Sequence, residues 1–110
     1  MIEKILLSYL SNVLTVPVYL EEPISKDNEY VIIEKTGSGK ENYLSSATLA
    51  IQSYSTSMST VIELNEKVKK AMEEMDIPEV CSCYLNSDYN WTDPETNRYR
   101  YQAVFDIYHY

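Results

Sequence analysis

The sequence predicts one α+β domain: a mainly antiparallel sheet of four to five strands with two helices packed on one face, in the order α–β–β–β–α–β–β. Three observations lead to this prediction. The chain has 110 residues, of which 45% are hydrophobic, as in an ordinary single globular domain. Two segments carry apolar side chains at helical spacing, and the others are β-branched or alternating. No repeat or linker-like stretch divides the chain.

The first helix is expected over residues 1–14, because its apolar side chains recur at the i, i+3, i+4 spacing of one buried face. This stripe consists of Ile2, Ile5, Leu6, Tyr9, Leu10 and Val13. The helix ends at Val16-Pro17, since a residue before proline avoids the helical region. Residues 17–20 are expected to form a short extended edge segment, and residues 21–28 a polar loop.

A β-branched strand over residues 30–35 follows, and a second strand covers residues 47–54. Residues 36–45 connect them and hold both glycines of the chain, Gly37 and Gly39. This connection is long enough to project as a hairpin arm, and its two strands most simply pair antiparallel.

The second helix follows the hydroxyl-rich residues 55–59 and is expected to run for about 18 residues, or ~27 Å. Thr60-x-x-Glu63 matches a capping box, although Ser57 or Ser59 could equally be the cap. Its inner face is expected to hold Met58, Val61, Ile62, Asn65, Val68, Met72 and Met75.

After Ile77-Pro78 ends this helix, residues 79–85 read as a strand, residues 86–97 as a polar loop and residues 98–110 as a long final strand. The final strand alternates, with one side formed by Tyr99, Tyr101, Ala103, Phe105 and Ile107. Two helices on one face of the sheet would bury these apolar stripes.

The charge balance disfavours nucleic-acid binding. Seventeen acidic residues against nine basic ones give a net charge of −8, whereas gripping phosphates needs clustered Lys and Arg. No run of about 18 apolar residues occurs, so no membrane span is expected.

Two patterns resemble chemical sites, and each is better explained without one. Ser38-Gly39-Lys40 lacks the earlier Gly and the following Ser or Thr of a phosphate-binding loop, and it lies between strands. Cys81-x-Cys83 could gain only His109 toward the four ligands of a zinc site. We therefore expect no enzyme, no metal and no cofactor.

Two aromatic segments remain unexplained by folding alone. Tyr89 and Trp91 stand in an otherwise polar loop, where they either fold back onto the sheet or meet another subunit. The arm, with Lys40 and Tyr43, poses the same question.

The sequence resembles the tail terminator (tail completion) proteins of long-tailed bacteriophages and of prophages of Gram-positive bacteria. The resemblance covers most of the chain and is strongest from Ala47 onward, while residues before it match only in their helix-then-strand order. The segments that carry it are residues 50–54 (AIQSY), 63–68 (ELNEKV), 85–90 (LNSDYN) and 98–110 (RYRYQAVFDIYHY).

This resemblance implies a structural virion protein at the head-proximal end of the tail, assembled in the host cytoplasm. Such proteins form a ring, usually a hexamer, that caps the tail tube and docks onto the head connector. The implied partners are further copies of the chain, the major tail tube protein and the connector or stopper protein. DNA would pass through without specific binding, helped by an acidic lumen, and no membrane is involved.

Carried onto this chain, the resemblance makes the arm and the loop over residues 86–97 interface elements. The expected subunit or tube contacts are Gly37, Ser38, Gly39, Lys40, Asn42, Tyr43, Tyr89 and Trp91. Two alternatives stay open. One is another head–tail joining protein, such as a stopper or tail assembly factor, and the other is a monomeric acidic cytoplasmic adaptor.

Overall fold

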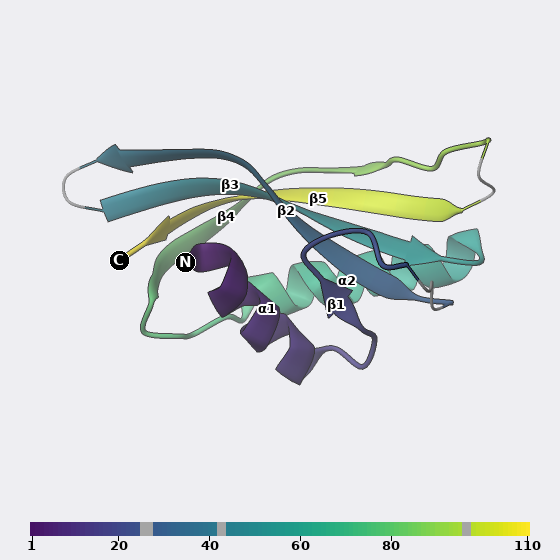
Figure 1. Cartoon of the computed structure of the whole chain (residues 1–110), viewed down its shortest axis with the longest axis horizontal. Helices are drawn as coiled ribbons and strands as arrows, with labels where there is room; N and C mark the ends of the chain where they lie inside the picture. The colour runs from purple at the N-terminus through teal and green to yellow at the C-terminus, as the bar shows by residue number, and fades with distance from the viewer. Residues whose placement is uncertain (25–27, 42–43, 96–97) are drawn as a thin grey trace.

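A five-stranded sheet runs the length of the molecule, and both helices lie against one of its faces (Figure 1). The computed structural model describes residues 1–24, 28–41, 44–95 and 98–110. The predicted fold class and element order are confirmed. The elements are α1 (Ile2–Val13), β1 (Val18–Tyr19), β2 (Tyr30–Glu41), β3 (Leu44–Ser55), α2 (Met58–Glu73), β4 (Val80–Asn90) and β5 (Tyr99–His109).

The sheet has the strand order β1-β2-β3-β5-β4. The predicted antiparallel pairing of β2 with β3 is confirmed, and β5 pairs antiparallel with both β3 and β4. The short β1 makes the one parallel pairing, through Val18 opposite Val31 and Tyr19 opposite Ile32. Because β4 follows α2 in sequence but lies beyond β5, the final strand is an interior strand of the sheet, between β3 and β4.

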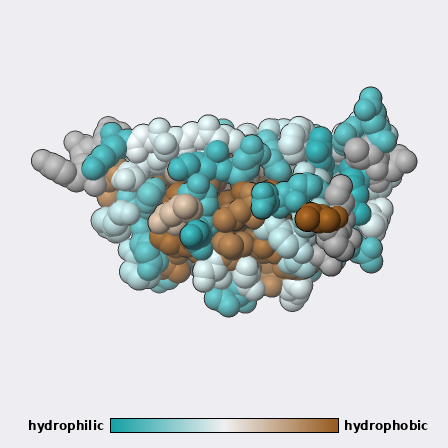
Figure 2. Space-filling model, in the orientation of Figure 1, coloured by the Kyte–Doolittle hydropathy of each residue, from teal (hydrophilic) through white to brown (hydrophobic). Residues whose placement is uncertain are grey.

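The hydrophobic core lies between the two helices and the sheet face beneath them. The apolar stripes predicted for the helices supply Ile2, Leu6 and Leu10 from α1 and Val68 and Met72 from α2. Leu64 also lies in the core although it was not predicted there, whereas Ile62 was expected to face inward and is exposed. The sheet contributes Val31, Ile33, Ala47, Leu49, Ile51, Ala103, Phe105 and Ile107. In the view of Figure 2, apolar surface gathers around the helices, while the arm is covered by more hydrophilic residues.

The start of α2 resolves the three capping alternatives. Ser57 has an extended backbone, and its hydroxyl accepts a hydrogen bond from the Thr60 amide at 3.3 Å. Ser57 is therefore the N-cap, and Thr60 already lies inside the helix. At the other end, α2 stops at Glu73, ahead of Pro78.

Two predicted loops are strands instead, which corrects the expected boundaries. Residues 36–45 are not an irregular connection: β2 continues to Glu41 and β3 begins at Leu44, so the arm is a paired β-hairpin. Residues 86–90 belong to β4 rather than to a loop, because the long β5 offers them hydrogen-bonding partners. The predicted contact residues Asn42 and Tyr43 lie outside the described residues.

Candidate functional site

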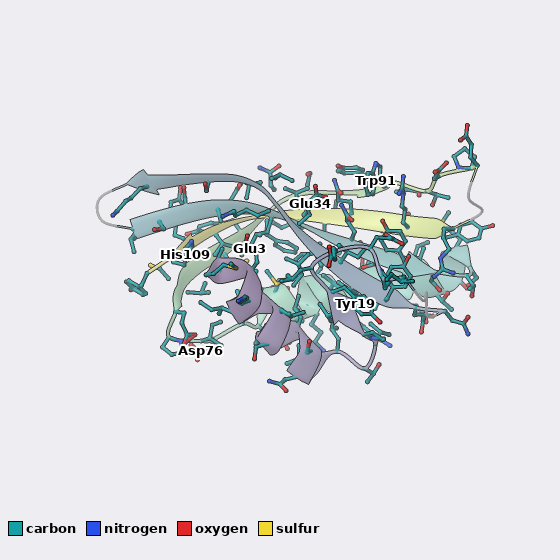
Figure 3. The ribbon with its side chains drawn as sticks, viewed as in Figure 1. Glu3, Tyr19, Glu34, Asp76, Trp91 and His109 are labelled. Atoms are coloured by element: carbon teal, nitrogen blue, oxygen red, sulfur yellow. The ribbon has the colours of Figure 1, made fainter. Side chains whose placement is uncertain are left out.

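The face of the sheet opposite the helices, called here the helix-free face, carries hydrogen bonds that cross from strand to strand. The Gln52 side-chain amide donates to Glu34 Oε2 at 2.9 Å and to Gln102 Oε1 at 3.0 Å. The amide of Gln102 in turn donates to the Tyr89 hydroxyl. These four side chains tie β2, β3, β5 and β4 together, and Figure 3 shows Glu34 and Trp91 on the side away from the helices.

A second set of hydrogen bonds runs alongside the first, closer to the arm. Thr48 Oγ1 donates to Asp106 Oδ1 at 3.1 Å, and Asn86 Nδ2 donates to the other oxygen of that carboxylate at 2.9 Å. Thr36 Oγ1 donates to the Thr48 carbonyl at 3.3 Å. The helix-free face is thus a polar surface whose side chains hold one another in place.

At the opposite end from the arm, aromatic rings and arginines cluster. The rings of Tyr30 and Tyr54 stack with their centroids 4.6 Å apart and an interplanar angle of 8°. Arg98 lies 5.2 Å from the centre of the Tyr30 ring, and Arg100 lies 3.8 Å from that of Trp91. Such arginine–aromatic contacts are attractive through the ring quadrupole.

Trp91 therefore folds back onto the sheet in a single chain, which is one of the two expected alternatives. Its side chain keeps 37% of its surface exposed, and Tyr89 keeps 42%. The second alternative, contact with another subunit, stays a prediction for both residues. The extended pairing of β4 makes Tyr89 a strand residue at the sheet edge, while Trp91 follows the strand directly.

A buried polar contact joins α2 to β4. The Asn65 side-chain amide is almost fully buried and donates to Asp88 Oδ1 at 2.7 Å. Lys69 contacts the other oxygen of that carboxylate at 2.6 Å and also reaches Glu66 at 2.7 Å. These hydrogen bonds raise the pKa of Lys69. The asparagine within the apolar stripe of the second helix was the sequence signal for this contact, whereas its partner on β4 was assigned to a loop.

We expect Asp88→Ala to lower the free energy of unfolding by about 1–3 kcal/mol, because it leaves the buried Asn65 amide without its acceptor. The matched control is Glu66→Ala, which removes the exposed partner of the same lysine and should cost less than about 1 kcal/mol. Urea denaturation followed by circular dichroism measures both values. Equal losses in the two variants would contradict a special role for the buried contact.

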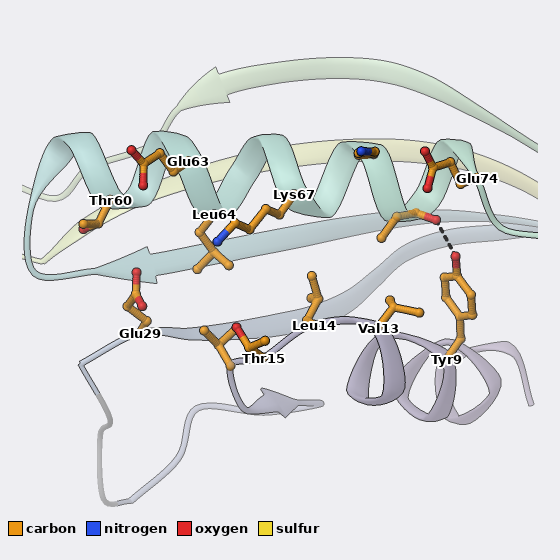
Figure 4. Close-up of a pocket in the computed structure, with 13 residues that line it drawn as sticks. Tyr9, Val13, Leu14, Thr15, Glu29, Thr60, Glu63, Leu64, Lys67 and Glu74 are labelled. Carbon is orange, nitrogen blue, oxygen red and sulfur yellow. Dashed lines mark hydrogen bonds between the residues drawn. The ribbon is translucent and has the colours of Figure 1, made fainter.

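A cleft of about 380 Å³ lies between the end of α1 and the outer side of α2 (Figure 4). Its apolar wall includes Leu14 and Leu64, and its rim carries Glu63 and Lys67. Tyr9 closes one end by donating a hydrogen bond to the Ala71 carbonyl at 2.6 Å, and burial raises the pKa of its hydroxyl. This cleft joins the two helices but presents no arrangement of groups that points to a reaction.

Cys83 is not poised as a nucleophile. Burial raises the pKa of Cys83 to about 11, the opposite direction from that of a nucleophilic thiol. Over residues 1–24, 28–41, 44–95 and 98–110, no group of three or more His, Cys, Asp or Glu side chains is placed to hold a metal ion. Within the same ranges, neither helix has the length and apolar character of a membrane span.

The structure separates the predicted contact residues into two groups. Gly37, Ser38, Gly39 and Lys40 lie on the arm, where β2 pairs with the start of β3. Tyr89 and Trp91 lie near the opposite end of the sheet, beside the arginine–aromatic cluster. Sequence reasoning missed the edge residues Tyr84 and Leu85, which expose 61% and 50% of their surfaces. Large apolar side chains in an otherwise polar strand were the available signal.

No protein-family model matches the chain, and no curated protein matches it significantly.

Proposed function

We propose that this chain is a structural protein of a long-tailed bacteriophage that forms a ring, with six copies expected, capping the tail tube and joining it to the head connector. The observation that carries the proposal is the arm. Its two strands extend the sheet beyond the helices and are paired through Glu41 opposite Leu44 (Figure 1). Apart from Leu44, its described side chains are small or polar, so it contributes little to the core and is free to reach a neighbour or the tube.

Two further features support an assembling role. The helix-free face is a broad, internally hydrogen-bonded surface, and β4 leaves one complete sheet edge open in the part of the chain that is described. Open edges in proteins are normally covered or blocked, and neighbours in a ring would cover this one. The resemblance of residues 50–54, 63–68, 85–90 and 98–110 to tail terminator proteins selects the ring at the end of a tail among possible assemblies.

The test is genetic and uses a phage or prophage that carries the gene. Deleting the gene should leave filled heads unjoined to tails, with tails of irregular length in electron micrographs, and supplying the intact chain should restore joined particles. Normal particles without the gene would overturn the proposal. Capture of the purified chain by connector protein but not by tube protein would instead indicate a joining role.

A shortened arm refines the same test. Replacing residues 39–46 by Asn-Gly closes the hairpin directly after Ser38 and before Ala47, which are paired residues. We expect this variant to fold with a circular dichroism spectrum close to that of the intact chain but to fail to restore joined particles. Full restoration would show that the arm is dispensable.

A further inference from the structure

The arm of β2 and the first half of β4 lie at opposite edges of the same transverse rows of the sheet. The register across the four long strands places one residue of each strand in every row. Three consecutive rows are Gly37–Thr48–Asp106–Tyr84, Ser38–Ala47–Ile107–Cys83 and Gly39–Ser46–Tyr108–Ser82. Each row begins at the outer side of β2 and ends at the outer side of β4.

Both ends of these rows are open in the described chain. β4 is the last strand of the sheet, and β1 covers β2 only at Val31 and Ile32. Each open segment is also regular. The bulge in β2 precedes Gly37, and the two bulges in β4 flank the stretch from Ser82 to Leu85. Regular backbone is what a further strand needs in order to pair.

The usual protections of an edge strand are missing from these segments. Proteins block open edges with charged side chains or proline, yet positions 82–85 are Ser, Cys, Tyr and Leu, and positions 37–39 are Gly, Ser and Gly; Lys40, at the end of the second segment, is the one charged residue of the two. In a chain of net charge −8, two stretches that are free of carboxylates are also the places where copies can approach without repulsion.

The two edges fit each other in shape and charge. Tyr84 exposes 61% of its surface and shares a row with Asp106 and Thr48, whose side chains bond on the helix-free face. In the same rows, Gly37 and Gly39 of the arm carry no side chain. An aromatic ring laid over edge glycines buries area that neither edge can bury alone. In the next row, the exposed Lys40 is aligned with Val80, and the residue before Val80 is the exposed Glu79. Pairing of the two edges would therefore bring these opposite charges near each other.

We propose that copies of this chain associate head to tail by pairing the Ser82–Leu85 edge of β4 with the Gly37–Lys40 edge of β2 in the next copy. Within one chain, β4 runs parallel to β3 and β3 runs antiparallel to β2, so β4 and β2 run in opposite directions. When two copies have the same orientation, β4 of one copy therefore lies antiparallel to β2 of the next. The same rows then continue from copy to copy, with Tyr84 over Gly37. This partner assignment deepens the proposed function and rests on it, since head-to-tail contacts close into a ring when the rotation allows.

Disulfide trapping between two different variants tests this pairing. In a background of Cys81→Ser and Cys83→Ser, one variant carries Gly37→Cys and the other Tyr84→Cys. A Cβ atom at Gly37 meets only ordinary contacts, at 3.8 Å from Thr48, so the first variant should fold normally. We expect mild oxidation of the mixture to produce a cross-linked pair, while each variant alone remains uncross-linked, because the two cysteines share a row only across two copies.

The matched control is Asn86→Cys in place of Tyr84→Cys. Asn86 lies on the same strand and face but in the bulge outside the proposed segment, so its cross-linking to Gly37→Cys should be at least about tenfold weaker. Cross-linking of either variant with itself would mean that the same edge of two copies meets, and this symmetric pairing would overturn the head-to-tail proposal. No cross-linking of the mixture up to about 1 mM, alone or with tube protein present, would overturn it.

This experiment and the gene deletion fail independently. If the mixture cross-links but phage particles without the gene are normal, the proposed edge pairing stands and the proposed tail function is wrong. If deletion leaves heads and tails unjoined but the mixture does not cross-link, the proposed function stands and the proposed edge pairing is wrong.

Discussion

Phe105→Ala is expected to lower the free energy of unfolding by about 3–5 kcal/mol, among the largest effects of a single truncation in this chain. The ring exposes only 3% of its surface and is the only phenylalanine in the sequence. It lies at the middle of β5, with Leu49 and Leu85 beside it in the register. Its removal leaves a cavity beneath α2, because the ring lines the groove between that helix and β4.

Urea denaturation at pH 7 measures this loss, and Tyr84→Ala is the matched control. Tyr84 lies on the neighbouring β4, one residue before Leu85, which pairs with Phe105. Because Tyr84 exposes 61% of its surface, its truncation should change stability by less than about 0.5 kcal/mol in the free chain. If Phe105→Ala lost under about 1 kcal/mol, the packing of α2 onto the sheet would be far looser than described.

The helices and the core strands could be predicted because their apolar residues keep one period. Leu6 and Leu10 repeat at helical spacing, while Leu49 and Ile51 alternate, and all four are buried as expected. The arm and the second half of β4 could not. They are polar on both faces, so alternation carries no signal there, and their strand structure depends on the partner strands rather than on local preference.

The candidate site was partly predictable for the same reason. Glycines in a long connection correctly indicated a hairpin, whereas the contact role expected for the aromatic residues of the polar segment stays a prediction. The hydrogen bonds between Gln52 and Gln102, and the rows that join the arm to β4, depend on register. Each bulge shifts that register by one residue and changes the face on which the following side chains lie. Composition alone does not locate those bulges.

The buried hydroxyl of Tyr30 makes the stability of the folded chain depend on pH. Its ring is fully buried and stacked on Tyr54, and its hydroxyl donates a 2.8 Å hydrogen bond to Glu22. Burial, reinforced by that carboxylate, raises the pKa of Tyr30 from 10.0 to about 12. The folded chain therefore keeps this proton at a pH where the unfolded chain has released it.

The stability that Tyr30 contributes is fully present below pH 10 and is lost as the pH rises through about 12, because unfolding then releases the proton. A shift of this size corresponds to roughly 3 kcal/mol across this window. Burial also raises the pKa values of Tyr54 and Cys83, which adds to the same alkaline loss.

Tyr30→Phe isolates the contribution of this one hydroxyl. At pH 8 the variant should be less stable by about 1 kcal/mol through loss of the Glu22 hydrogen bond. Between pH 10 and 12 its stability should fall less steeply than that of the unchanged chain, so the two curves approach and cross. Urea denaturation at half-unit pH intervals measures this, and parallel curves would contradict a buried, carboxylate-bonded Tyr30. A crossing would show that the aromatic cluster closes its end of the helix-free face in solution.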